Sequence, residues 1–331
     1  MNVKYSRGVL LCLIATLSWG GMFPVMTGAL RHIDPFTFTC MRYAIAGLAF
    51  LAVLLYREGR AGLNLKGERI ALAWFLGTAG FAGFQFLVFF GQKLAGPEGA
   101  LTASIMMATM PMLGFIVNWV VRKVRPPLGA LGFILMSFFG VTLVVTQGHY
   151  GSLLNHPGAY GAEALIILGA LCWVIYTYGA SFFPTWSPYK YTTITTGLGL
   201  TSALAFTAAL LAFGGISFPS MDSIGTITPH LAYMATAAGF VGVLCWNLGN
   251  KALGPLNGVL FMDVVPVTAF TVSALQGIHA GPIQIVGATI TAVALILNNM
   301  YLRHRMTPAP IAPAPVPVTE KTPVTASANS A

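Results

Sequence analysis

One short stretch occurs twice in the chain, and this duplication limits the possible folds more than any other feature. Residues 91–97 read GQKLAGP, and residues 249–255 read GNKALGP, 158 positions further on. Other pairs match at similar offsets: Trp19 with Trp173, Thr78 with Thr236, Pro111 with Pro266, Pro127 with Pro282, and Gly132 with Gly287. The pattern indicates that one ancestral half was duplicated, with residues 1–148 as the first copy and residues 149–305 as the second.

Composition places both copies in a membrane. Of the 331 residues, 56% are hydrophobic and only 8% are charged, whereas an ordinary soluble domain has roughly 25% charged residues. The net charge of +9 does not indicate nucleic acid as a partner, because the basic residues lie at the ends of apolar runs, where membrane topology needs them. The four cysteines show no CxxC spacing, so neither a disulfide framework nor a metal site is expected.

Ten apolar stretches have about the length of ~20 residues that a transmembrane helix needs. We therefore expect an all-α integral membrane protein with ten transmembrane helices, near residues 8–30, 36–56, 70–92, 98–120, 128–147, 160–183, 190–213, 229–250, 256–277 and 283–302. Residues 306–331 are rich in Pro and Ala and predict a disordered tail.

The basic residues predict the orientation. With the N-terminus in the cytoplasm, 14 of the 17 Lys and Arg residues fall on the cytoplasmic side, which also places the C-terminal tail there. We expect a multi-pass protein of the cell (inner) membrane. Because each half holds five helices, an odd number, the second copy crosses the membrane in the opposite sense, and the repeat is inverted.

Two charged residues lie inside predicted helices, Arg42 in the second and Asp263 in the ninth. A charge at this depth costs about 2.5 to 3.5 kcal/mol on insertion scales and calls for an explanation. Together the two side chains could hold a zwitterionic substrate, or Asp263 could exchange a proton. The alternative is a structural ion pair or a hydrogen-bonded buried group.

Several aromatic and amide side chains also fall inside predicted helices. A helix-lined cavity for an organic molecule needs apolar walls with a few fixed donors and acceptors. Such residues are candidates to bind substrate, with simple packing between helices as the alternative for each: Trp19, Tyr43, Gln85, Trp173, Tyr176, Trp246 and Asn247.

Two further repeat-related pairs suggest moving parts. Pro111 and Pro266 lie within predicted helices and cannot donate to the helix ladder, so we expect a kink and a hinge at each, unless the kinks are purely structural. Lys93 and Lys251 should lie on opposite faces and are gate candidates; the plainer interpretation is that each side chain extends from a helix end towards water.

No motif for catalysis is present, and no HExxH, GxSxG or P-loop occurs. We therefore expect no catalytic residue, no metal site and no cofactor. The expected partners are a small-molecule substrate and the lipid bilayer, with protons and a second copy of the chain as open alternatives, and nucleic acid is not expected.

The chain resembles the drug/metabolite transporter superfamily, and within it the ten-helix EamA-like bacterial metabolite exporters. The resemblance rests on ATLSWGGMFPV, on MRYAIAGLAF and on the GP junctions before Pro111 and Pro266. It implies a central cavity between helices one to four and six to nine, with helices five and ten outside, and export by alternating access. Amino acids or related amphipathic compounds are the expected substrates. A membrane enzyme acting on lipid or isoprenoid, and a non-transporting membrane partner or sensor, are the alternatives.

Overall fold

A computed structural model describes residues 3–96, 99–123, 128–146, 148, 160–275, 277 and 281–305. These residues form helices and short connections, without a strand among them. The expectation of an all-α fold is confirmed. The predicted tail, residues 306–331, lies outside the described residues.

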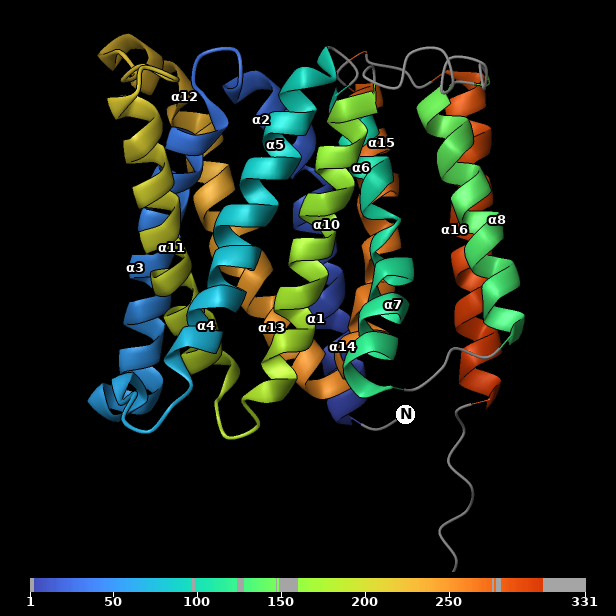
Figure 1. Ribbon diagram of the computed structural model, residues 1–331, viewed down its shortest axis with the longest axis horizontal. Helices are drawn as coiled ribbons and strands as arrows, with labels where there is room; N and C mark the ends of the chain where they lie inside the picture. Colours follow the sequence, from blue (N-terminus) through green and yellow to red (C-terminus); the bar gives the residue numbers. More distant parts are fainter. Residues whose placement is uncertain are drawn as a thin grey trace, which may run out of the picture.

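The helices run roughly parallel or antiparallel to one another in a single bundle (Figure 1). In chain order they are α1 (Val3–Gly20), α2 (Met22–Ala29), α3 (Pro35–Glu58), η1 (Gly59–Leu63), α4 (Ile70–Gly77), η2 (Thr78–Gly83), α5 (Phe84–Leu94), α6 (Gly99–Met107), α7 (Met110–Arg122), α8 (Leu128–Thr146), α10 (Gly161–Gly179), η5 (Ala180–Phe182), α11 (Pro188–Ala212), α12 (Met221–Tyr233), η6 (Met234–Val241), α13 (Gly242–Leu253), α14 (Pro255–Val259), η7 (Leu260–Asp263), α15 (Val264–Leu275) and α16 (Pro282–Arg305).

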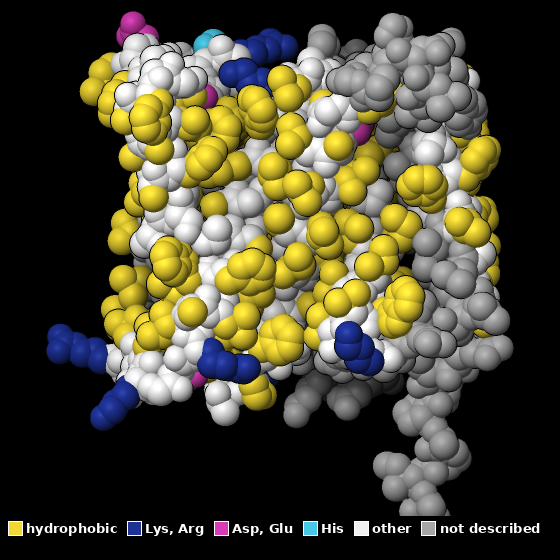
Figure 2. All heavy atoms as spheres, in the orientation of Figure 1, with side chains coloured by type: hydrophobic (Ala, Val, Ile, Leu, Met, Phe, Trp, Pro, Cys, Tyr) yellow, Lys and Arg dark blue, Asp and Glu magenta, His cyan; other side chains and the backbone are white. Residues whose placement is uncertain are grey.

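Each of the ten predicted segments coincides with a helix or with a run of consecutive helices. Among the described residues, seven helical segments are long and apolar enough to cross a membrane, and the bent pair α6–α7 makes an eighth. Apolar side chains cover the side of the bundle, and Lys and Arg side chains gather at its two ends (Figure 2). The chain is thus a multi-pass membrane protein, and the count of ten stays a prediction.

The two halves run in opposite directions through the bundle (Figure 1). We call the end where α1 begins the N-terminal face. The run α4–η2–α5 starts at the N-terminal face and ends at the opposite face, whereas its counterpart α12–η6–α13 descends in the reverse sense. Helix α16 ends at the N-terminal face, close to the level of the start of α1.

The repeated stretch ends a helix in each half. Gly96 and Gly254 both have a positive φ, 70° and 83°, which a residue with a side chain rarely adopts, so each glycine stops its helix. The first glycines of the two stretches face a neighbouring helix. A Cβ at Gly91 would lie 2.7 Å from the carbonyl oxygen of Ala162 in α10, and one at Gly249 would meet Cys12 in α1. The motif therefore sets both the packing and the end of these helices.

The proline pair coincides with broken helices. Pro111 lies in the first turn of α7, where α6 and α7 meet at a bend of 40°. Pro266 follows η7, a 3₁₀ segment that separates α14 from α15. The helical run is thus bent before Pro111, whereas before Pro266 it continues through a 3₁₀ segment. In both places the missing N–H and the ring clash of proline weaken the preceding ladder.

A second repeat-related pair of irregularities is a π-helical segment in each half. These are η2, which begins at Thr78, and η6, which contains its counterpart Thr236. A π-helix is rare and occurs mostly as a single bulge within an α-helix, often at a functional site. The duplicated half therefore carries a bulge at the centre of its third helical run.

Helices α8 and α16 pack against each other at one side of the bundle (Figure 1). Their backbones approach closely, since a Cβ at Gly140 would lie 2.6 Å from the carbonyl oxygen of Gly287. Small residues allow such contact between membrane helices. The remaining long helices surround the centre of the molecule.

Candidate functional site

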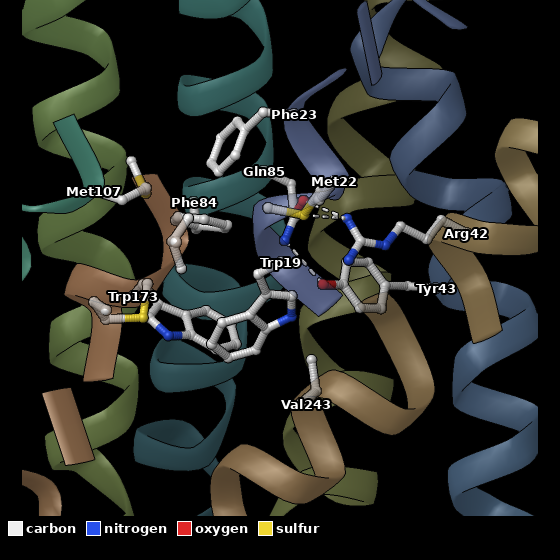
Figure 3. Close-up of a pocket in the computed structure, with 12 residues that line it drawn as sticks. Trp19, Met22, Phe23, Arg42, Tyr43, Phe84, Gln85, Met107, Trp173 and Val243 are labelled. Carbon is white, nitrogen blue, oxygen red and sulfur yellow. Dashed lines mark hydrogen bonds between the residues drawn. The ribbon is translucent and has the colours of Figure 1, made fainter. Parts of the chain in front are cut away.

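A small cavity lies at the centre of the bundle, lined from both halves (Figure 3). Its volume of about 10 Å³ is roughly that needed for one water molecule. The lining residues are Trp19, Met22, Phe23, Arg42, Tyr43, Phe84, Gln85, Met107, Trp173, Val243, Met262 and Val265. Five of the predicted substrate-binding residues are among them, and none of the described lining residues belongs to α8 or α16.

Arg42 supplies a buried cation on one wall of this cavity. Its Nη1 donates to Oε1 of Gln85 at 2.9 Å and contacts the Met22 sulfur at 3.6 Å (Figure 3). Nε2 of Gln85 in turn donates to the Tyr43 hydroxyl at 2.9 Å, and the guanidinium lies 4.9 Å from the centre of the Tyr43 ring. The sequence placed these three residues on two separate helices, and the fold joins them into one polar network.

The charge of Arg42 has no described counter-ion. The side chain is 1% exposed, and its Nε has no hydrogen-bond partner among the described residues. Within the same part of the chain, the one ion pair joins Lys190 to Glu68. Asp263 ends η7, but its side chain is outside the described residues. That it supplies charge to the same cavity as Arg42 stays a prediction. A guanidinium in an apolar interior is costly without a partner and favours binding of an anion.

Three tryptophans meet beside the network. The Trp19 ring lies 5.2 Å from that of Trp173, edge to face, and 5.1 Å from that of Trp246. Nε1 of Trp19 donates to the carbonyl oxygen of Ala238 in the π-helix η6 at 2.9 Å. Nε1 of Trp173, its counterpart in the repeat, has no partner among the described residues. The duplicated position therefore provides two of the aromatic rings that line the cavity.

Tyr176 and Asn247 lie next to the cavity but do not line it. Nδ2 of Asn247 donates to the Tyr176 hydroxyl at 2.7 Å and to Oγ1 of Thr192 at 2.8 Å. Beside them, Nε1 of Trp246 donates to Oγ1 of Thr177 at 3.0 Å. This second network belongs to the second half of the chain and separates the central cavity from the N-terminal face.

A larger cavity of about 320 Å³, which we call the vestibule, lies at the N-terminal face. It is lined by Thr177, Ala180, Ser181, Phe183, Pro184, Trp186, Ser187, Pro188, Tyr191, Asn247, Asn250, Lys251, Gly254 and Pro255. Asn247 and Thr177 belong to both the vestibule and the network just described. The gate candidate Lys251 lies on its wall.

The other gate candidate, Lys93, lines a cavity at the opposite face. This cavity of about 530 Å³ lies between the α2–α3 connection and the α11–α12 connection. Its lining includes Arg31, His32 and Asp34. Lys93 and Lys251 thus lie at opposite ends of the bundle, as the repeat predicts, and each faces a cavity.

Some residues of these sites were not foreseen from the sequence. Met22 contacts the guanidinium of Arg42, and the hydroxyl of Tyr191 donates to the carbonyl oxygen of Tyr176 at 2.7 Å. For Tyr191 a signal exists, because SPYKY at the start of α11 repeats the DPFTF that begins α3.

Comparison with known proteins identifies the same family in both halves of the chain. Residues 6–146 and again residues 161–300 match the EamA-like transporter family. The chain is 36% identical over 296 residues to "Uncharacterized transporter YrdR" of Bacillus subtilis, covering 89% of this chain and 92% of that protein. It is 25% identical over 288 residues to "Uncharacterized transporter YyaM" of the same organism, covering 86% and 90%.

A solved structure titled only "Crystal structure of protein" has a TM-score of 0.67 and 19% identity, over 91% of this chain and 99% of the other. That likeness concerns the fold alone. The double family match agrees with the two halves, and the identity to YrdR extends over nearly the whole chain. The chain therefore belongs to the EamA-like transporter family of the drug/metabolite transporter superfamily, and it is a membrane transporter.

Proposed function

We infer that this transporter exports small organic molecules that carry a carboxylate and an apolar body, with amino acids as the leading class. The observation that carries the proposal is the Arg42 guanidinium, buried beside the tryptophans and without a described carboxylate partner. A carboxylate would pair with two N–H groups of an arginine in a geometry that no other side chain offers. The Trp19 and Trp173 rings would contact the apolar part of the same molecule.

Alternating access would explain the size of the cavities. The central cavity, at about 10 Å³, is too small for an amino acid, whereas the cavities at the two faces are about 320 and 530 Å³. An arrangement of this kind corresponds to a constricted central site between two larger cavities. Rocking of one repeat against its inverted copy would enlarge the centre towards one face at a time.

The charges at the two faces support a topology for the transporter. Eight described cations lie on helix ends and connections at the N-terminal face: Arg7, Arg57, Arg60, Lys66, Arg69, Lys123, Lys190 and Lys251. Arg31 and Lys93 lie at the opposite face. The excess favours a cytoplasmic N-terminal face in the inner membrane, and the vestibule would then receive substrate from the cytoplasm.

Labelling in intact cells tests this topology. Lys93→Cys and Lys251→Cys are each introduced into a variant without the four native cysteines, and a membrane-impermeant maleimide is added from outside. We expect labelling at position 93 alone, and labelling at 251 only after the cells are opened. Equal access from one side would contradict the inverted repeat and the direction built on it.

Transport by the purified protein in proteoliposomes tests the substrate class. Tritiated leucine and phenylalanine are compared with their decarboxylated amines, isoamylamine and phenethylamine. We expect saturable flux of the amino acids and none of the amines. Arg42→Gln should abolish this flux, and Arg42→Lys, which keeps the charge but loses the planar fork, should retain a small part of it. Equal flux of acids and amines, or no saturable flux with folded protein, would refute the proposal.

A further inference from the structure

We propose that the vestibule is a second substrate-binding site, in which Lys251 holds the substrate carboxylate before the molecule reaches Arg42. The inference rests on the proposed function, because it assigns a role to a site on the same pathway. It further assigns the equivalent role at the opposite face to Lys93.

The vestibule has the dimensions and the walls of a ligand site. Its volume of about 320 Å³ falls within the range of roughly 300 to 1,000 Å³ typical of small-molecule pockets. Phe183, Trp186 and Tyr191 provide aromatic surface, and the ring centres of Phe183 and Trp186 lie 4.4 Å apart. Asn247 and Lys251 provide the polar groups. Apolar walls with a few fixed polar groups suit an amphipathic molecule.

Lys251 has capacity to bind an anion. Its Nζ donates to the carbonyl oxygen of Pro184 at 3.2 Å, on the connection between α10 and α11. An ammonium group has three N–H donors, and no other partner of this one is found in the described part of the chain. Glu58 accepts a hydrogen bond from Ser187 on the same rim and forms no ion pair with Lys251.

The vestibule leads towards the central site. Thr177 and Asn247 line the vestibule and also hold Trp246 and Tyr176 by hydrogen bonds. Trp246 packs directly on Trp19, which lines the central cavity. A molecule bound in the vestibule is therefore separated from the Arg42 cavity by one layer of aromatic side chains. The hydrogen bonds of that layer must rearrange for the molecule to pass.

The repeat provides independent support, since it builds the opposite cavity from corresponding parts. Lys93 corresponds to Lys251, and Asp34, which caps α3, corresponds to Ser187, which caps α11. Both cavities are thus lined by the lysine of the repeated stretch and by the connection before the second helix of each half. Lys93 forms no ion pair in the described part of the chain, although its cavity also contains Asp34, whose carboxylate accepts from two backbone amides of α3.

Lys251 in the vestibule and Arg42 in the centre therefore mark one route, and Lys93, together with Arg31, supplies positive charge to the cavity at the opposite face. A cation at each mouth raises the local concentration of an organic anion, and a weak site at each end allows release as well as capture. An inverted duplication would place an equivalent cation at each face of a carrier of anions.

Sided transport kinetics test the inference. Proteoliposomes with one known orientation of the protein are supplied with tritiated phenylalanine or leucine, whichever gives the larger flux, from one face at a time. The variants are Lys251→Gln, Lys251→Arg and, as the matched control from the other half, Lys93→Gln. Monodisperse elution in detergent confirms that each variant is folded.

We expect Lys251→Gln to raise the half-saturating concentration by about tenfold when substrate is supplied from the N-terminal face, because one charge-assisted hydrogen bond is lost. The half-saturating concentration from the opposite face should stay unchanged. Lys251→Arg should restore the half-saturating concentration to within a factor of about two of the wild-type value. Lys93→Gln should raise the half-saturating concentration from the opposite face and leave that from the N-terminal face unchanged. An unchanged value from the N-terminal face, or an equal rise from both faces, would overturn the inference while saturable wild-type flux upholds the proposed function. Absence of saturable wild-type flux would instead remove the proposed function itself.

Discussion

The first glycine of the repeated stretch offers a sharp test of how the halves pack. Gly91 is buried where α5 meets α10, and a Cβ there would lie 2.7 Å from the carbonyl oxygen of Ala162 and 2.7 Å from Cγ1 of Ile166. Carbon and carbonyl oxygen normally approach no closer than about 3.3 Å. The Gly91→Ala variant must therefore move the two helices apart by about half an ångström, and overpacking of this kind costs about 1 to 3 kcal/mol.

Gly197→Ala is the matched control, because a Cβ at that exposed position of α11 meets no atom within 4 Å. Both substitutions gain the same helix propensity, up to about 1 kcal/mol, so the difference between the two variants isolates the packing cost. With a shift of about 2 °C per kcal/mol, Gly91→Ala should unfold about 2 to 6 °C below Gly197→Ala in detergent. Thermal unfolding followed by fluorescence-detected size exclusion measures this. Equal unfolding temperatures would refute the close contact of α5 and α10.

Three further outcomes are expected. Trp19→Phe loses the hydrogen bond to η6, worth about 1 kcal/mol, so it should lower the unfolding temperature by about 2 °C. Trp173→Phe loses no described hydrogen bond and should lower the unfolding temperature less. The reverse order would contradict the assigned donors. Gln85→Glu places a carboxylate beside Arg42, so the unfolding temperature should rise and amino-acid flux in proteoliposomes should disappear. Retained flux would exclude Arg42 as the anion site. Asp34→Ala removes the cap of α3, which accepts from two backbone amides at 2.9 and 2.8 Å; thermal unfolding should show a loss of about 1 kcal/mol, and no change would mean that the cap is not formed.

Much of the architecture was accessible from the sequence because it rests on duplication and hydropathy. The offset between the two repeated stretches places Trp19 opposite Trp173, and the structure brings the two rings into contact. A charge in an apolar run has few tolerable surroundings, so the burial of Arg42 beside polar side chains also followed from its position. These features depend on residue type and spacing along the chain.

The details of the central site depend on which faces of the helices meet. Lipid and protein surroundings are both apolar, so the hydrophobic pattern of a membrane helix does not reveal its inward face. That is why Met22 was missed as a neighbour of Arg42, and why Tyr176 and Asn247 were grouped with the cavity although they lie beside it. The small volume of the cavity likewise reflects the relative positions of whole helices.

The paired π-helical segments have a mechanical consequence. A π turn contains one residue more than the α turn that it replaces, so each of the two helical runs, α4–η2–α5 and α12–η6–α13, carries one spare residue at its middle. If the bulge moves along the helix, each residue that it passes rotates by about 100° about the helix axis, while the segments on either side stay where the connections hold them. Twisting within a single helix could thus turn side chains towards or away from the centre without any movement of the helix as a whole.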